Sequence, residues 1–115
     1  MLFLEYPPCS TCKKAKQYLL DRGIGFECRH IKEQNPGYEE LRDWVARSGL
    51  PLRRFFNTSG MLYQSLHLKD RLPEMSEEEQ LRLLATDGML VRRPILVRDD
   101  LVLVGFRPNE WDEKL

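Results

Sequence analysis

The stretch that decides the fold of this chain reads Tyr6-Pro7-Pro8-Cys9-Ser10-Thr11-Cys12-Lys13. It follows an apolar run over residues 1–4, which is typical of a buried strand. It leads into residues 10–22, whose apolar positions recur at helical spacing. Two cysteines three positions apart therefore lie where a strand turns into a helix, with Cys9 near the N-cap and Cys12 one turn inside.

This position favours a nucleophilic thiol at Cys9. The free backbone N–H groups of the first helical turn and the positive end of the helix dipole both stabilise negative charge. A thiolate is favoured there, and the thiolate is the reactive form of cysteine. Cys12 is near enough to attack a mixed disulfide formed on Cys9. The spacing therefore predicts an attacking thiol, Cys9, and a resolving thiol, Cys12.

The alternative for this pair is a zinc site. A closed zinc site needs four ligands, and the only further candidates are Cys28 and His30. Their spacing is unlike that of common zinc modules, whereas Cys-x-x-Cys near a βαβ pattern is the usual context of a redox dithiol. We therefore favour redox chemistry and expect no metal and no cofactor. Cys28 and His30 are expected to be buried strand residues.

Composition excludes several classes of function. The chain has 115 residues and 42% hydrophobic content, which predicts one domain over residues 1–115. Acidic and basic residues balance at 18 each, which argues against direct binding of nucleic acid. The N-terminal apolar run lacks a basic flank and is too short for a signal peptide or a membrane span. We therefore expect a cytoplasmic protein with no membrane contact.

The chain after the dithiol predicts a second strand and then a helical insert. Residues 24–31 alternate as a strand does, so strand, helix and strand form a right-handed βαβ unit. Residues 35–90 show helical patterns and form the insert. Asn35-Pro36 is expected to open its first helix, with Asn35 as N-cap. Residues 76–79 read as the capping box of its last helix.

The C-terminal quarter predicts a hairpin and a short helix. Residues 93–98 and 101–104 read as antiparallel strands joined by a tight turn, and residues 109–114 form a last helical turn. The predicted fold class is α/β and thioredoxin-like, with the order βαβ–helical insert–ββα and a mixed four-stranded sheet.

With these elements in place, the chain resembles the ArsC/Spx family of thioredoxin-fold proteins along nearly its whole length. The resemblance is closest to the arsenate reductase-like branch, whose members also carry the dithiol. The matching segments are residues 8–13, 57–60, 66–73, 87–90, 92–95 and 104–106.

The resemblance implies roles for individual residues. In the arsenate reductases of this family a single cysteine attacks arsenate, and three arginines hold the oxyanion. Cys9 matches that cysteine, and Arg93 and Arg107 match two of the arginines. The third position falls near Asn57, and this chain has arginines a turn earlier, at residues 53–54.

We assign three further residues to substrate binding beside Arg93 and Arg107. Ser10 and Thr11 lie in the loop between the two cysteines. Pro94 matches the proline that faces the dithiol in thioredoxin folds, and the resemblance implies that its peptide bond is cis.

Three functions stay open on the sequence, and the residues do not separate an enzyme from a regulator. The leading hypothesis is a thiol–disulfide redox protein whose Cys9–Cys12 disulfide is reduced by an external thiol, of the glutathione or the thioredoxin/glutaredoxin type. The resemblance to Spx implies a redox-switched regulator that binds the C-terminal domain of the RNA polymerase α-subunit. The third hypothesis is true arsenate reduction.

Overall fold

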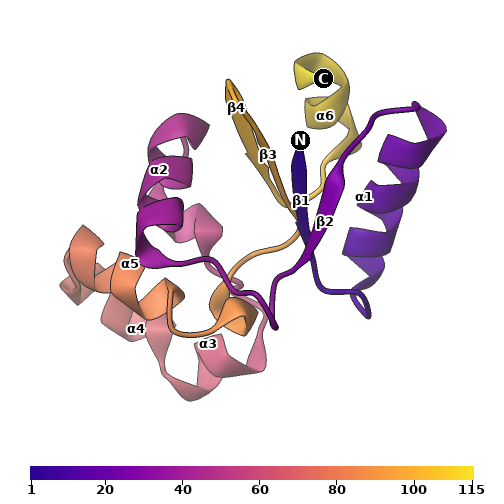
Figure 1. The fold of residues 1–115 in the computed structure, drawn as a ribbon. Coiled ribbons are helices and arrows are strands. Elements are labelled where there is room, and N and C mark those ends of the chain that lie inside the picture. The colour runs from indigo at the N-terminus through magenta and orange to yellow at the C-terminus, as the bar shows by residue number, and fades with distance from the viewer.

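The computed structural model describes residues 1–115, and a four-stranded sheet forms its centre (Figure 1). The strands are β1 (Leu2–Glu5), β2 (Glu27–His30), β3 (Ile95–Arg98) and β4 (Leu101–Val104). Their spatial order is β2-β1-β3-β4. β1 pairs in parallel with β2 and antiparallel with β3, and β3 pairs antiparallel with β4. The predicted mixed sheet is therefore confirmed.

Helices cover both faces of this sheet (Figure 1). One face carries α1 (Ser10–Asp21) and α6 (Pro108–Lys114). The other face carries the insert between β2 and β3, in which η marks a 3₁₀ helix. The insert consists of α2 (Tyr38–Ser48), η1 (Leu52–Phe55), α3 (Met61–Ser65), α4 (Leu68–Arg71), η2 (Leu72–Glu74), α5 (Glu77–Leu84) and η3 (Gly88–Leu90). The predicted order βαβ–helical insert–ββα is confirmed.

Neighbouring residues of the central strand pack into two separate cores, because successive side chains of a strand point to opposite faces. Phe3 packs with Leu19 of α1 and Trp111 of α6. Leu4 packs on the other side with Phe55 and the rest of the insert. All five of these side chains are fully buried. The two cores together hold the end of β1 in place, and the chain runs from there into the dithiol.

The helix ends follow the local signals in the sequence. α1 is followed by Gly23 at φ 66°, and α2 is followed by Gly49 at φ 69°, both left-handed. At the start of α5 the Glu79 N–H donates to Ser76 Oγ (3.1 Å). The Ser76 N–H donates in return to the Glu79 carboxylate (3.0 Å), so the predicted capping box is confirmed.

The predicted start of the insert at Asn35-Pro36 is wrong by two residues. The N-cap of α2 is Gly37, whose N–H donates to the Glu40 carboxylate (3.1 Å). The side-chain amide of Asn35 instead donates to the Ala85 carbonyl oxygen (2.8 Å). Asn35 therefore ties the loop to the end of α5, and this tertiary contact overrides the local capping preference.

The prediction that Cys28 is buried is also wrong, since its side chain is exposed. β2 is an edge strand, and Cys28 lies beside Glu5 and Lys16 and not in an apolar core. His30 is half-buried, and its Nδ1 accepts two backbone N–H groups of the following turn (both 3.2 Å).

None of the helices combines the length and the apolar character needed to cross a membrane.

Candidate active site

The two cysteines of the dithiol lie at the start of α1, as the sequence indicated. Cys9 is the N-cap residue, and Cys12 occupies the first turn. The Cys9 N–H donates to the Tyr6 carbonyl oxygen (2.8 Å), and the Cys9 carbonyl oxygen accepts the Lys13 N–H (3.1 Å). This turn leaves the Cys9 side chain half-buried, whereas the Cys12 side chain is fully buried.

The surroundings of Cys9 favour its thiolate. Partial burial by itself raises the pKa of this thiol. The backbone N–H groups of Cys12 and Thr11, the Cys12 thiol and the Arg93 guanidinium all act in the opposite direction. Together they outweigh the burial and hold the pKa of Cys9 below its ordinary value of 9.0. Cys9 is therefore the more readily ionised thiol of the pair.

The surroundings of Cys12 favour its neutral thiol. The pKa of Cys12 is raised to about 12, mainly by burial; the Tyr6 backbone lowers it, the neighbouring Cys9 adds to the rise, and the charge of Arg93 acts against it. Burial and a nearby like charge both disfavour ionisation of a thiol. The structure thus separates one ionisable, accessible thiol from one protonated, buried thiol. That asymmetry is what an attacking and a resolving cysteine require.

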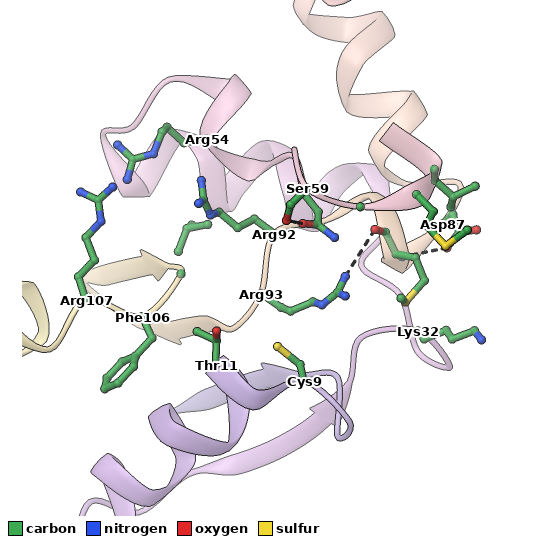
Figure 2. Close-up of a pocket in the computed structure, with 17 residues that line it drawn as sticks. Cys9, Thr11, Lys32, Arg54, Ser59, Asp87, Arg92, Arg93, Phe106 and Arg107 are labelled. Atoms are coloured by element: carbon green, nitrogen blue, oxygen red, sulfur yellow. Dashed lines mark hydrogen bonds between the residues drawn. The ribbon is translucent and has the colours of Figure 1, made fainter. Parts of the chain in front are cut away.

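Arg93 extends beside Cys9 (Figure 2), and its guanidinium contacts Tyr6 and Met89. Its guanidinium carbon lies 5.1 Å from the centre of the Tyr6 ring, within cation–π range. Its Nη1 lies 3.5 Å from the Met89 carbonyl oxygen, to which it donates. Arg93 takes part in none of the ion pairs of the structure. Its positive charge is therefore available to the thiolate or to a bound anion.

Cys9 opens into a pocket of about 710 Å³ between the sheet and the insert. Figure 2 shows the residues that surround it. They are Cys9, Thr11, Lys32, Arg54, Asn57, Ser59, Gly60, Met61, Leu62, Asp87, Met89, Arg92, Arg93, Val104, Gly105, Phe106 and Arg107. The volume lies in the range of sites for small molecules.

The pocket brings together some of the residues that the sequence assigned to substrate binding, and leaves others out. Thr11, Arg93 and Arg107 line it with Cys9. Ser10 is exposed at the first position of α1 and does not line it. Pro94 is buried behind the lining, and the Arg93–Pro94 peptide bond is cis, as the resemblance implied.

Arg54 and Arg92 are pocket residues that the sequence analysis did not assign. Both face the same part of the pocket as Arg107 (Figure 2). Burial lowers the pKa of Arg92, and the charges of Arg54 and Arg107 lower it further. Three like charges therefore act on one another across this end of the pocket. The adjacent arginines Arg92 and Arg93 were a signal in the sequence. The sequence did not show that Arg93 lies beside Cys9 and that Arg92 lies at the end of the pocket with Arg54 and Arg107.

The acidic and metal-ligating side chains near the pocket do not form a metal site. Asp87 is the one carboxylate that lines the pocket, and it accepts the Met89 N–H (2.8 Å) as the cap of η3. No three His, Cys, Asp or Glu side chains are grouped so as to hold a metal ion. The chemistry of the pocket rests on its thiol and its guanidinium groups.

Comparison with known proteins places the chain among redox and regulatory proteins of one family. The model of the ArsC family matches residues 4–114. The uncharacterized protein YusI of Bacillus subtilis (strain 168) is 49% identical over 113 residues, which are 98% of this chain and 96% of YusI. The regulatory protein MgsR of the same organism is 32% identical over 110 residues, covering 96% of this chain and 86% of MgsR. A crystal structure of an ArsC family related protein from Bacteroides fragilis has a TM-score of 0.95 and 54% identity, covering 97% of this chain and 94% of that one.

Proposed function

The chain belongs to the ArsC family, as its sequence segments indicated, and from this premise we propose that it is a thiol–disulfide oxidoreductase with Cys9 as nucleophile and Cys12 as resolving thiol. The observation that supports the proposal best is the contrast between the two thiols. The pKa of Cys9 is lowered at the mouth of a pocket, while the pKa of the buried Cys12 is raised to about 12.

The first step is attack by the Cys9 thiolate on one sulfur of a substrate disulfide. A sulfur–sulfur bond forms between Cys9 and the substrate, the substrate's own sulfur–sulfur bond breaks, and the leaving thiolate takes a proton from solvent. The Arg93 guanidinium next to Cys9 stabilises the negative charge before attack. The thiolate is the form that attacks, so this charge stabilisation sets the fraction of reactive protein at neutral pH.

The second step is attack by Cys12 on the Cys9 sulfur. Forming the mixed disulfide removes the Cys9 negative charge, which is one of the causes that raise the pKa of Cys12. Cys12 then releases its proton more readily and displaces the second substrate thiol, leaving a Cys9–Cys12 disulfide. The dithiol has lost two electrons and the substrate disulfide has gained them. Two equivalents of an external thiol reduce the Cys9–Cys12 disulfide by the reverse exchange.

The direct test is turnover of bis(2-hydroxyethyl) disulfide with glutathione as electron donor. Cys9→Ser should abolish turnover, and Cys12→Ser should accumulate a mixed disulfide on Cys9 that mass spectrometry detects. Cys28→Ser is the matched control, because Cys28 lies outside the pocket on an edge strand, and it should keep full activity. Full activity of the Cys9→Ser protein, with glutathione and with a donor of the thioredoxin/glutaredoxin type, would exclude this function.

The similarity to the regulatory protein MgsR and the resemblance to the transcriptional regulator Spx support a second candidate. Here the Cys9–Cys12 couple changes a surface that docks on the C-terminal domain of the RNA polymerase α-subunit, and no turnover is needed. A pull-down with that domain, using the reduced and the oxidised protein, tests it. Absence of binding in both redox states would exclude this candidate, whereas binding together with a lack of turnover would favour it over the enzyme.

Arsenate reduction is a third candidate, since Arg93 and Arg107 line one pocket with Cys9. The position matched by the third oxyanion-binding arginine falls near Asn57, and Arg54 lines the same pocket from the preceding turn. Steady-state reduction of arsenate with glutathione present tests this candidate. A rate that equals the rate without protein would exclude it.

A further inference from the structure

Three arginines from distant parts of the chain converge at the end of the pocket away from Asp87 (Figure 2). Arg54 belongs to η1 in the insert, Arg92 lies two residues before the cis proline Pro94, and Arg107 is the N-cap residue of α6. The backbone of the insert and both ends of the hairpin are needed to bring them together. Their convergence is therefore a property of the fold and not of one local segment.

None of the three guanidinium groups has a partner within the protein. The seven ion pairs of the structure involve other arginines and lysines. The side chain of Arg92 lies against Gly105, where an added Cβ would be 3.5 Å from its Nε, and Arg92 is half-buried. Arg92 and its two neighbours repel one another, and this repulsion, together with burial, lowers the pKa of Arg92. Such a group of unpaired charges is relieved when an anion binds.

The geometry of guanidinium groups narrows the class of anion. Arginine donates two parallel N–H groups to a carboxylate, and such charge-assisted pairs are among the stronger hydrogen bonds of proteins. Three arginines can hold more than one carboxylate. Apolar side chains also line the pocket, including Met61, which is 87% exposed, and Phe106. The ligand therefore carries carboxylates for the arginines, and its uncharged part lies against these side chains.

We propose that Arg54, Arg92 and Arg107 bind the carboxylates of a low-molecular-weight disulfide and so place its sulfur–sulfur bond at Cys9. The proposal rests on the proposed oxidoreductase function and names its substrate class: small disulfides built from cysteine, of which glutathione disulfide is the probe. A pocket of about 710 Å³ suits such a molecule better than a folded protein.

The reaction at this site is the exchange described above, with glutathione disulfide as the oxidant. Cys9 forms a bond to one glutathione sulfur and the second glutathione leaves as a thiol after taking a proton. Cys12 then releases the first glutathione, and the dithiol is left as the Cys9–Cys12 disulfide. The arginines form and break no bond. They act by holding the carboxylates through both steps.

The test is the second-order rate of oxidation of the reduced protein in a Cys28→Ser background. Four disulfides form a charge series: glutathione disulfide, the same molecule with its carboxylates esterified, the neutral bis(2-hydroxyethyl) disulfide and the cationic cystamine. Each rate is compared between the parent protein and the variants Arg54→Gln, Arg92→Gln and Arg107→Gln. The ratio of variant to parent cancels the intrinsic reactivity of each disulfide.

The matched control is Arg53→Gln. Arg53 is adjacent to Arg54 but lines a separate groove with Pro73 and Gln80. Each of the three pocket variants should slow oxidation by glutathione disulfide about tenfold, with less effect at high salt, because one charge-assisted contact is lost. Oxidation by the esterified and neutral disulfides should stay within about twofold of the parent rate, since these molecules offer no carboxylate to the arginines. Arg53→Gln should change none of the rates.

Two results would overturn the proposal. Equal slowing of charged and neutral disulfides would show that the arginines act on the dithiol and not on the substrate. Unchanged rates with glutathione disulfide in all three variants would show that the cluster does not bind it. The neutral disulfide distinguishes failure of this proposal from failure of the proposed function. If the parent protein does not react with the neutral disulfide, the oxidoreductase function itself is rejected.

Discussion

Cys12 lowers the pKa of the Cys9 thiol in two ways, through its backbone N–H and through its thiol. Both effects favour the Cys9 thiolate, while burial favours the protonated thiol of Cys12. In the proposed mechanism, the resolving cysteine is therefore also one of the residues that activate the nucleophile. This double role makes the reactivity of Cys9 sensitive to the side chain at position 12.

The first prediction concerns the pH dependence of Cys9 alkylation. Because the pKa of Cys9 lies below 9.0, the rate of alkylation by iodoacetamide should reach half its maximum below pH 9. Cys12→Ala removes the thiol donor and should shift the curve to higher pH, whereas Cys12→Ser keeps a hydroxyl donor and should shift it less. A Cys28→Ser background leaves Cys9 as the accessible thiol. A curve that is the same in all three proteins would show that the Cys12 side chain does not stabilise the thiolate.

The second prediction concerns Arg93. Arg93→Gln removes a positive charge that lowers the pKa of Cys9, so the thiolate fraction at pH 7 should fall. Alkylation of Cys9 at pH 7 should slow by about threefold to tenfold, since the site is partly open to solvent. Lys14→Gln is the control, because Lys14 is exposed on α1 outside the pocket. Equal rates of Cys9 alkylation in the Arg93→Gln and Lys14→Gln proteins would show that Arg93 does not stabilise the thiolate.

The third prediction concerns the stability of the junction between the insert and the sheet. Gly88 is buried, and an added Cβ would lie 1.8 Å from the Ile31 carbonyl oxygen, which is part of the backbone. Gly88→Ala should lower the free energy of unfolding by at least about 2 kcal/mol, because the overlap forces the backbone to move. Gly25→Ala meets no atom within 4 Å and should change stability little. Urea denaturation of both variants measures the difference, and equal stabilities would contradict the close approach.

The fourth prediction concerns the buried carboxylate of Glu5. Lys16 Nζ lies 3.2 Å from Glu5 Oε2, and the Glu5 side chain is 9% exposed. Lys16→Met removes the partner of a nearly buried charge and should destabilise the protein by about 1 kcal/mol, a value reduced for the exposure of the lysine. Lys14→Met is the control on the exposed face of α1. Thermal unfolding of both variants in low and high salt checks the prediction, which fails if the two variants unfold alike.

Much of the fold could be predicted because local patterns and tertiary packing agree. The strand before Cys9, the helix after it and the hairpin of β3 and β4 follow directly from alternating or helical apolar spacing. The exposure of Cys28 could not be predicted, since an alternating pattern does not show that a strand lies at the edge of its sheet. The start of α2 was missed because Asn35 bonds to Ala85, which lies fifty residues away in the chain.

The site could be predicted in part. Cys9 and Cys12 follow from their spacing and position, and Arg93 and Arg107 follow from the resemblance. Arg54 and Arg92 could not be assigned, because their meeting with Arg107 depends on how the insert packs beside the hairpin. Ser10 is adjacent to Cys9 in sequence but lies outside the pocket lining, since the helix turns its side chain to solvent.

The most direct test of the proposed dithiol mechanism is a redox titration of the reduced protein in glutathione and dithiothreitol buffers, read by thiol alkylation and mass spectrometry. We expect a reversible disulfide between Cys9 and Cys12, with Cys28 in no disulfide within the protein at any potential. If no Cys9–Cys12 disulfide forms, Cys12 is not a resolving thiol, and the dithiol mechanism is contradicted.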